Sequence, residues 1–195
     1  MTSILVVCTG NICRSPIAEG LLRDALTARF GTAAPAVSSA GTWGVEESGA
    51  TAEAVTAASE RGADITGHRA RRLTTASTED VDLIVAMASE HRVALTDEHG
   101  AGDRAFTLKE LVRLLESMAP ASPGAGPDSL TDRVSQATGA RRAGFTGNPF
   151  DEDVADPLGL PLQSYRAIAW ELDEWIARLV DGLYGATTIP AASEG

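Results

Sequence analysis

Apolar residues along this chain form short continuous runs that alternate with stretches of helical periodicity. The continuous runs predict strands at residues 3–7, 36–40, 81–87 and 104–106. Helical spacing predicts helices at residues 15–30, 48–62, 89–96, 107–117 and 162–183. Strands that alternate with helices in this way are typical of a parallel sheet. We therefore expect a three-layer α/β fold, with a four-stranded parallel sheet flanked by helices.

Residue types at the predicted helix boundaries support these elements. Ser15 is a good N-cap, and Pro16 suits the first position of the helix that follows it. Thr107 followed three positions later by Glu110 is the pattern of a capping box.

The composition changes between residues 118 and 150, where proline, glycine and alanine accumulate. This stretch predicts a long mobile insertion with one short helical turn near residues 129–137. The rest suits one domain over residues 1–185, and residues 186–195 are expected to form a flexible tail.

Overall composition restricts the partners of the protein. Hydrophobic residues make up 44% of its 195 residues, yet no apolar run approaches the roughly 20 residues needed to span a membrane. The formal net charge of −11 argues against nucleic acid or an anionic membrane as the main partner. The chain begins directly with a strand, so we predict no signal peptide. The two cysteines lie in one loop, which predicts a reducing cytoplasm and not a disulfide framework.

That loop, Cys8-Thr9-Gly10-Asn11-Ile12-Cys13-Arg14-Ser15, lies between the first predicted strand and helix. Such a loop can surround an oxyanion the size of phosphate, because its N–H groups and the helix N-terminus supply partial positive charge. Arg14 can hold two oxygens with its planar guanidinium group. Cys8 would then lie below the phosphorus, with its thiolate favoured by the same field. This arrangement suggests nucleophilic attack by sulfur on a phosphate monoester.

The run from Val7 to Pro16 resembles the signature of the low-molecular-weight protein tyrosine phosphatases, as found in bacteria. The resemblance implies a Rossmann-like phosphatase fold in which the loop residues Thr9 to Cys13 bind phosphate and Ser15 hydrogen-bonds the thiolate. It also implies a hydrogen-bond network of Asn11, Ser15, Ser39 and His68 that holds the loop shape. Trp43 aligns with the region that supplies an aromatic wall to the substrate cleft.

Attack by a thiolate also requires an acid that protonates the leaving oxygen. In the resembled family, this acid is an Asp-Pro pair on a mobile loop before the last helix, which corresponds here to Asp156-Pro157. Asp153 is the substitute candidate. The sequence departs from the family at Leu158-Gly159-Leu160, where aromatic residues are common, and at Ala88, where many members have Asp.

We therefore expect a cytoplasmic phosphatase that acts on protein phosphotyrosine or another aryl phosphate, without a metal or cofactor. Two alternatives remain open. One is an arsenate reductase that uses an external small thiol, and the other is a phosphopeptide-binding protein without activity. Cys13 adds a redox hypothesis, because a second thiol near Cys8 could trap it as a regulatory disulfide. The sequence leaves the oligomeric state open.

Overall fold

The structure is a computed structural model that describes residues 2–122, 124–144 and 151–186. Its four strands form one parallel sheet in the order β2-β1-β3-β4, and they span β1 Ser3–Cys8, β2 Ala36–Gly41, β3 Leu83–Ala86 and β4 Ala105–Thr107. In this register Val6 of β1 pairs with Ser39 on one side and with Val85 on the other. The four-stranded parallel sheet expected from the sequence is confirmed.

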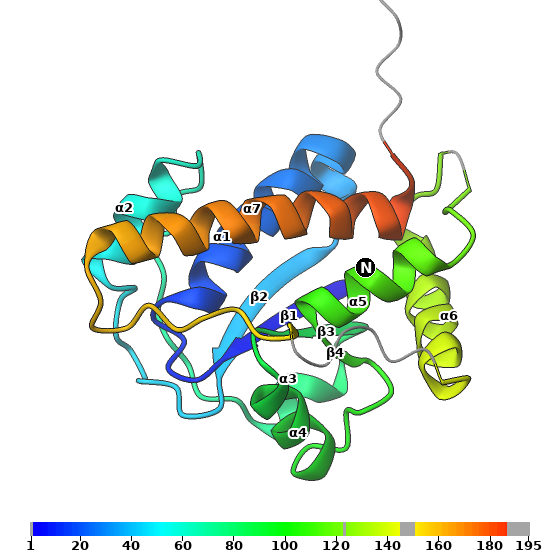
Figure 1. The fold of residues 1–195 in the computed structure, drawn as a ribbon, viewed down its shortest axis with the longest axis horizontal. Coiled ribbons are helices and arrows are strands. Elements are labelled where there is room, and N and C mark those ends of the chain that lie inside the picture. The colour runs from blue at the N-terminus through cyan, green and yellow to red at the C-terminus, as the bar shows by residue number, and fades with distance from the viewer. Residues whose placement is uncertain (1, 123, 145–150, 187–195) are drawn as a thin grey trace, which may run out of the picture.

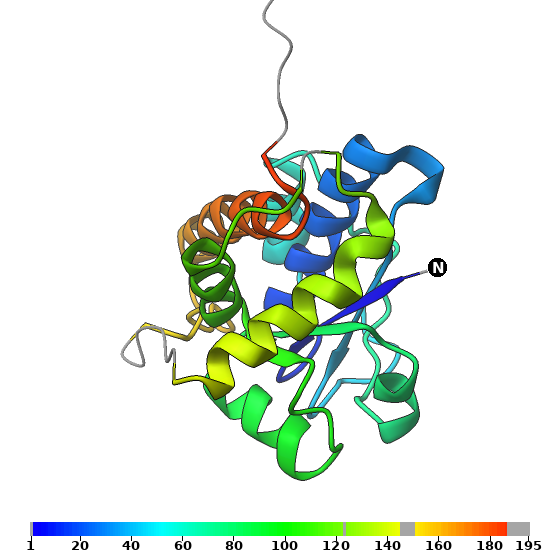
Figure 2. The same cartoon turned by 90° about the vertical axis from the view of Figure 1, so that its right-hand side faces the viewer.

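Alternation along β1 divides the core into two layers, because successive strand side chains point to opposite faces of a sheet. Ile4, Val6 and Cys8 join one apolar cluster, whereas Leu5 and Val7 join the other. The first layer contains the helices α1 Arg14–Phe30, α2 Ala52–Ser59, α5 Leu108–Ser117, α6 Leu130–Arg142 and α7 Leu162–Tyr184. On the opposite face lie α3 Thr75–Glu79 and α4 Ser89–Asp97 (Figures 1 and 2).

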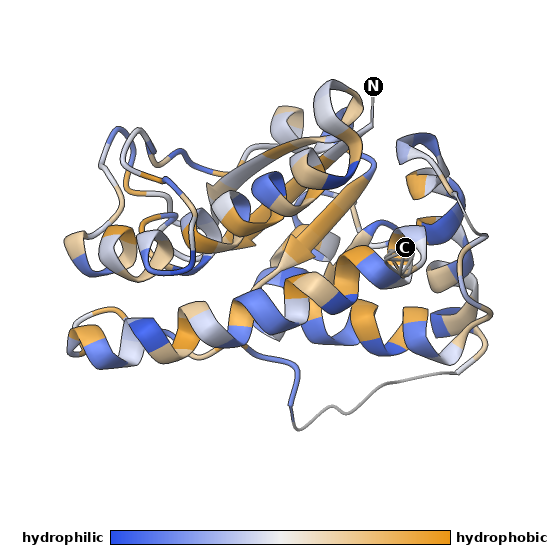
Figure 3. Cartoon of the chain, turned by 90° about the horizontal axis from the view of Figure 1, so that it is seen from above, coloured by the Kyte–Doolittle hydropathy of each residue, from blue (hydrophilic) through white to orange (hydrophobic). Residues whose placement is uncertain are grey.

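Helix α7 organises the first layer, because it packs against α1, α2 and α5. Its apolar stripe is buried as the periodicity predicts, through Tyr165, Ile168, Ala169, Leu172, Ile176, Leu179 and Leu183. The strands in the middle of the fold are mostly hydrophobic, whereas the helices around them alternate between polar and apolar residues (Figure 3). None of the helices in the described residues is both long enough and apolar enough to span a membrane.

Two predicted helix starts are wrong. Helix α1 begins at Arg14 with Cys13 in the N-cap position, because the hydroxyl of Ser15 contacts the loop and does not cap the helix. Helix α2 begins only at residue 52, where the side chain of Thr51 accepts a hydrogen bond from the N–H of Ala54. The capping box of Thr107 and Glu110 at the start of α5 is confirmed.

The stretch from 118 to 150 contains more regular structure than one helical turn. A short 3-10 helix, η2 Pro127–Ser129, leads into α6, which has 13 residues. Leu130, Val134 and Ala137 are buried along one side of α6, which packs against α5 and β3. Polar residues dilute this apolar side, so its periodicity is weak in the sequence. Residues 123 and 145–150 of the predicted insertion and residues 187–195 of the predicted tail lie outside the described residues.

Candidate active site

The loop between β1 and α1 lies at the carboxyl edge of the sheet, since Cys8 is the last residue of β1 and Arg14 the first of α1. Its carbonyl groups are bonded to the segment that follows β2. The four bonds run from Thr42 N–H to Cys8 O (3.0 Å), Trp43 N–H to Thr9 O (2.9 Å), Val45 N–H to Gly10 O (3.1 Å) and Thr51 N–H to Ile12 O (3.0 Å). Because the C=O and N–H of one trans peptide point in opposite directions, bonding the carbonyls outward turns loop amides toward the centre.

Asn11 lies at the centre of the network that holds this loop. It has a φ of 56°, a left-handed conformation that Asn tolerates better than most residues, and it is fully buried. Its Nδ2 donates to Ser15 Oγ at 2.9 Å and to Ser39 Oγ at 2.7 Å, while its carbonyl oxygen lies 2.7 Å from His68 Nε2. The structure thus brings together the four residues that the resemblance placed in one network.

Two further residues complete this network and were missed in the sequence. Glu19 on α1 accepts a hydrogen bond from Ser39 Oγ at 2.5 Å. The backbone N–H of Arg71 donates to Asn11 Oδ1 at 2.9 Å. Helical spacing placed Glu19 only on α1, and no sequence pattern indicates a backbone donor at Arg71, so both contacts depend on the tertiary fold.

Cys8 Sγ lies within the loop and is almost completely buried. It accepts a hydrogen bond from the N–H of Asn11 at 3.3 Å and lies 2.9 Å from Ser15 Oγ. Hydrogen bonds to sulfur from an N–H and a hydroxyl stabilise negative charge on it. The contact with Ser15 predicted from the resemblance is therefore present.

Arg14 connects the loop to a segment far away in the chain. Its Nη2 donates to Thr9 Oγ1 at 3.2 Å and to Asp156 Oδ2 at 2.7 Å. Its Nη1 donates to the backbone oxygen of Val154 at 3.1 Å. The side chain of Arg14 is only 5% exposed, against 45% for Asp156, so the arginine is fixed while the carboxylate remains open to solvent.

The two candidate acids have different contacts. Asp156 contacts Arg14, and its Oδ1 accepts the N–H of Leu158 at 3.1 Å. Asp153 instead accepts the N–H of Ser89 at 2.7 Å and its hydroxyl at 2.8 Å. Ser89 begins α4, and Ala88 in the N-cap position offers no side-chain oxygen. Asp153 therefore supplies the cap that Ala88 lacks.

His91 on α4 is a residue of the site that the sequence did not reveal. Its Nε2 lies 2.9 Å from Thr9 Oγ1, the same hydroxyl oxygen that accepts from Arg14. The ring is 2% exposed, and its Nδ1 has no hydrogen-bond partner among the described residues. Burial, followed by the charge of Arg14, lowers the pKa of His91 to about 4. The imidazole beside Thr9 is therefore neutral at neutral pH.

Cys13 lies behind the loop. Its Sγ lies 3.6 Å from Tyr165 Oη and 3.8 Å from Thr51 Oγ1. Burial raises the pKa of the Cys13 thiol, an effect that these two contacts oppose in part. Both cysteines are free thiols, and the disulfide between them stays a hypothesis.

Trp43 is 71% exposed, and its ring lies 5.3 Å from the guanidinium carbon of Arg72. With Thr9, Arg72, His91 and five other residues, it lines a hollow of about 290 Å³ beside the loop. Within the ranges that the structure describes, His, Cys, Asp and Glu side chains form no group of three or more that could hold a metal ion.

Comparisons with known proteins agree with this geometry. The model of the family described as low molecular weight phosphotyrosine protein phosphatase matches residues 3–122. A protein-arginine-phosphatase from Geobacillus stearothermophilus is 30% identical over 92% of this chain and 95% of its own length. A low molecular weight phosphotyrosine protein phosphatase from Drosophila melanogaster is 50% identical, but this match spans only 25% of this chain and 24% of that protein.

Solved structures resemble the whole fold. A low molecular weight protein tyrosine phosphatase from T. tengcongensis has a TM-score of 0.70 at 32% identity, and the match covers 94% of this chain and all of that one. The YwlE arginine phosphatase from Geobacillus stearothermophilus has a TM-score of 0.68 at 30% identity, with 94% and 93% covered. The chain therefore belongs to the low molecular weight phosphotyrosine protein phosphatase family and is a cysteine-dependent phosphatase that hydrolyses phosphate esters.

Proposed function

We propose that this chain dephosphorylates protein phosphotyrosine through a phosphocysteine on Cys8, with Arg14 binding the phosphoryl group and Asp156 serving as general acid and base. The observation that carries this proposal is the contact between Arg14 Nη2 and Asp156 Oδ2 at 2.7 Å, which joins two residues 142 positions apart beside the Cys8 loop. An acid at this place lies next to the oxygen that leaves a phosphoryl group held by the arginine.

In the first step, Cys8 Sγ attacks phosphorus, the S–P bond forms and the bond to the ester oxygen breaks. Asp156 gives its proton to the leaving phenolate. Arg14 and the inward loop amides stabilise the negative charge on the three phosphoryl oxygens of the transition state. In the second step, Asp156 takes a proton from water, the water oxygen bonds to phosphorus, and the S–P bond breaks. Ser15, at 2.9 Å from Sγ, stabilises the departing sulfur anion.

Apolar side chains near the loop favour an aryl substrate. The side chains of Trp43, Val45 and Leu158 are 71%, 47% and 55% exposed. Trp43 and Val45 are bonded to the loop through their backbone N–H groups, and Leu158 follows Asp156 by two positions. Such a rim offers a phenyl ring contacts that the phosphate loop itself lacks.

Phosphoarginine is the second candidate substrate, because one relative that matches almost the full length of this chain is a protein-arginine-phosphatase. Peptides of one sequence that carry phosphotyrosine, phosphoarginine or phosphoserine would separate these candidates by kcat/KM. We expect phosphotyrosine to be turned over fastest, Cys8→Ser to be inactive and Asp156→Ala to be slower by about 100-fold or more. Full activity of Cys8→Ser would refute the mechanism, and faster turnover of phosphoarginine would refute the substrate.

The remaining expectations each have their own test. Arsenate-dependent consumption of a small thiol would support the reductase alternative, and tight peptide binding without turnover would support the binding-protein alternative. Placement in a reducing cytoplasm stays a prediction, which cell fractionation can test.

A further inference from the structure

The segment that leads to Asp156 begins with three acidic residues, and each of them is held by the body of the fold. Asp151 accepts hydrogen bonds from Lys109 Nζ at 2.8 Å and from Arg113 Nη2 at 2.7 Å. Glu152 accepts from the hydroxyl of Thr107 and lies 3.3 Å from Arg113 Nη1. The third residue, Asp153, caps α4 as described above. The segment lies outside helices and strands, so these contacts take the place of a backbone ladder.

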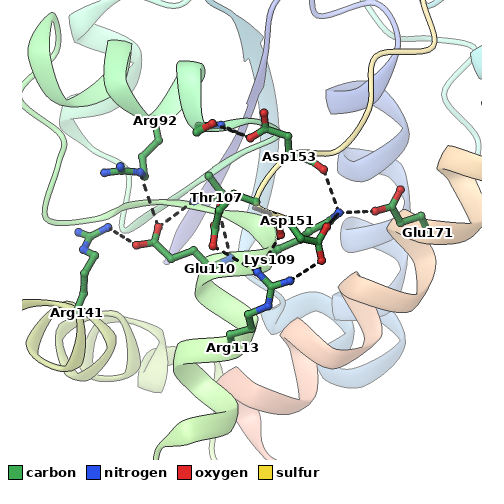
Figure 4. Close-up of polar contacts among 11 residues, drawn as sticks. Arg92, Thr107, Lys109, Glu110, Arg113, Arg141, Asp151, Asp153 and Glu171 are labelled. Carbon is green, nitrogen blue, oxygen red and sulfur yellow. Dashed lines mark hydrogen bonds and ion pairs between the residues drawn. The ribbon is translucent and has the colours of Figure 1, made fainter. Parts of the chain in front are cut away.

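Lys109 is the centre of this arrangement (Figure 4). Its Nζ donates to Asp151 Oδ1 at 2.8 Å, to the backbone oxygen of Asp153 at 3.0 Å and contacts Glu171 Oε1 on α7 at 2.8 Å. Its side chain is only 6% exposed. An ammonium group has three N–H donors, and here three acceptors from two parts of the chain satisfy them.

The place of Lys109 in the chain also indicates a specific role. It is the only lysine in the sequence, which otherwise uses arginine as its strong base. It lies in the first turn of α5, where the helix dipole disfavours a positive charge. Its pKa is nevertheless raised, because the hydrogen bonds and charges of Asp151 and Glu171 outweigh the opposing effect of burial. The helix dipole and burial both disfavour a lysine at this position, so we attribute its presence to its acidic partners.

The residues that Lys109 holds lie close in the chain to Asp156. Directly after Asp153, the N–H of Val154 donates to the backbone oxygen of Met87 at 2.8 Å. The carbonyl of Val154 accepts from Arg14 Nη1 at 3.1 Å. Two residues further on, Asp156 precedes Pro157, which restricts its backbone to extended conformations. The anchors along residues 151–154 therefore limit where the carboxylate of Asp156 can reach.

We propose that Lys109 is a positioning residue for the general acid, whose ammonium group holds residues 151–153 so that Asp156 faces the Cys8 loop. This inference rests on the proposed role of Asp156. Loss of the ammonium group removes one anchor of residues 151–153 and leaves Asp151 and Glu171 as neighbouring like charges. The carboxylate of Asp156 then spends less time in the position from which it protonates the leaving oxygen.

The test compares kcat/KM for a series of aryl phosphates whose leaving phenols range from acidic to weakly acidic. A dinitrophenolate leaves without a proton, whereas an unsubstituted phenolate needs one, so only weakly acidic phenols require the acid. We expect a flat dependence in the wild type and a steep loss in Asp156→Ala. Lys109→Met should lose about 10-fold with phenyl phosphate and less than about twofold with 2,4-dinitrophenyl phosphate.

A double variant separates positioning from general loss of structure. If Lys109 acts through Asp156, Lys109→Met should change kcat/KM by less than about twofold in the Asp156→Ala background. Arg166→Gln is the matched control, because it removes an ion pair of 2.6 Å between α7 and Glu60, the C-cap residue of α2. Neither partner contacts residues 151–156, so this control should leave the leaving-group dependence flat.

The outcomes distinguish the two proposals. A flat profile in Asp156→Ala would overturn the proposed acid and this inference with it. A steep profile in Asp156→Ala beside a flat profile in Lys109→Met, or equal losses from Lys109→Met in both backgrounds, would overturn the inference alone. If Lys109→Met does not fold, Asp151→Asn serves instead, because that side chain is half exposed. It should show the same selective loss at smaller size, and an unchanged profile would overturn the inference.

Discussion

Replacing His91 by glutamine should make this protein less sensitive to acid. His91 is 2% exposed, with Nε2 at 2.9 Å from Thr9 Oγ1 and Nδ1 without a partner. A protonated ring would have to place a positive charge in this site. Burial and the nearby charge of Arg14 oppose that, and they lower the pKa of His91 to about 4. Asp153 and Asp156 act in the opposite direction, and Glu90 Oε1 lies 3.4 Å from Nε2 on the same helix.

The size of the effect follows from the difference between the pKa of His91 in the unfolded chain and in the folded chain. An unfolded histidine has a pKa of about 6.5, so between about pH 6.5 and 4 the unfolded chain binds a proton that the folded chain does not. Unfolding therefore takes up a proton, and acid favours the unfolded state. One pKa unit corresponds to about 1.4 kcal/mol, which gives a loss of about 2 kcal/mol between pH 7 and pH 5 from this residue. The loss begins as the pH falls below 6.5 and is complete below about pH 4.

Urea denaturation of wild type and His91→Gln at pH 7, 6 and 5 measures this difference directly. The amide of glutamine can keep the hydrogen bond to Thr9, but it does not titrate. The free energy of unfolding should fall by about 2 kcal/mol more in the wild type than in the variant over this range. Carboxylates elsewhere titrate equally in both proteins, so they cancel in the comparison. Parallel pH profiles for the two proteins would refute the reasoning.

Three further outcomes are expected. Gly41→Ala should lower the free energy of unfolding by at least about 2 kcal/mol and abolish most of the activity. The added Cβ would collide with the carbonyl oxygen of Thr9 and lie 3.0 Å from the backbone nitrogen of Asn11. Chemical denaturation and a phosphatase assay test this. In a Cys8→Ser protein, iodoacetamide at pH 7 should leave Cys13 unmodified, because burial raises the pKa of its thiol; mass spectrometry would reveal a modified Cys13 if this is wrong. Trp43→Ala should change stability by no more than about 1 kcal/mol, because the ring is exposed and lies against the guanidinium group of Arg72. It should raise KM for aryl phosphates more than it lowers kcat.

The sequence predicted the framework because its apolar patterns are strong. Buried strands read as continuous runs, and the stripe of α7 repeats over 23 residues. Helix α6 was underestimated, because its buried Leu130, Val134 and Ala137 are separated by charged and small residues. The start of α1 was misplaced for a different reason. Ser15 has the residue type of an N-cap, but its hydroxyl is required inside the loop, so a tertiary contact overrides the local preference.

The residues of the site likewise divide into those that a local sequence pattern reveals and those that only the fold brings together. Cys8 and Arg14 could be found because one short loop carries both. A motif of neighbouring residues can be recognised in the sequence without knowledge of the fold. Asp156 needed the resemblance, because an Asp-Pro pair by itself marks only a turn. His91 carries no local signal, and Lys109 is distinguished in the sequence only as its single lysine. Lys109 contacts Asp151, more than forty positions away, and His91 contacts Thr9, more than eighty positions away. Such contacts form only after the sheet has assembled.

These distant contacts explain why the loop motif is necessary but not sufficient for the site. The carbonyls of the loop are held by residues 42–51, its central Asn11 by Ser39 and Arg71, and its arginine by Val154 and Asp156. Each support comes from a different element that ends at the carboxyl edge of the sheet or follows it. A peptide with the sequence of the loop alone would lack all of these supporting contacts. Holding Asn11 in its left-handed conformation would then cost free energy that no contact offsets. The parallel sheet therefore contributes to catalysis, because it places these supporting residues at one edge before substrate binds.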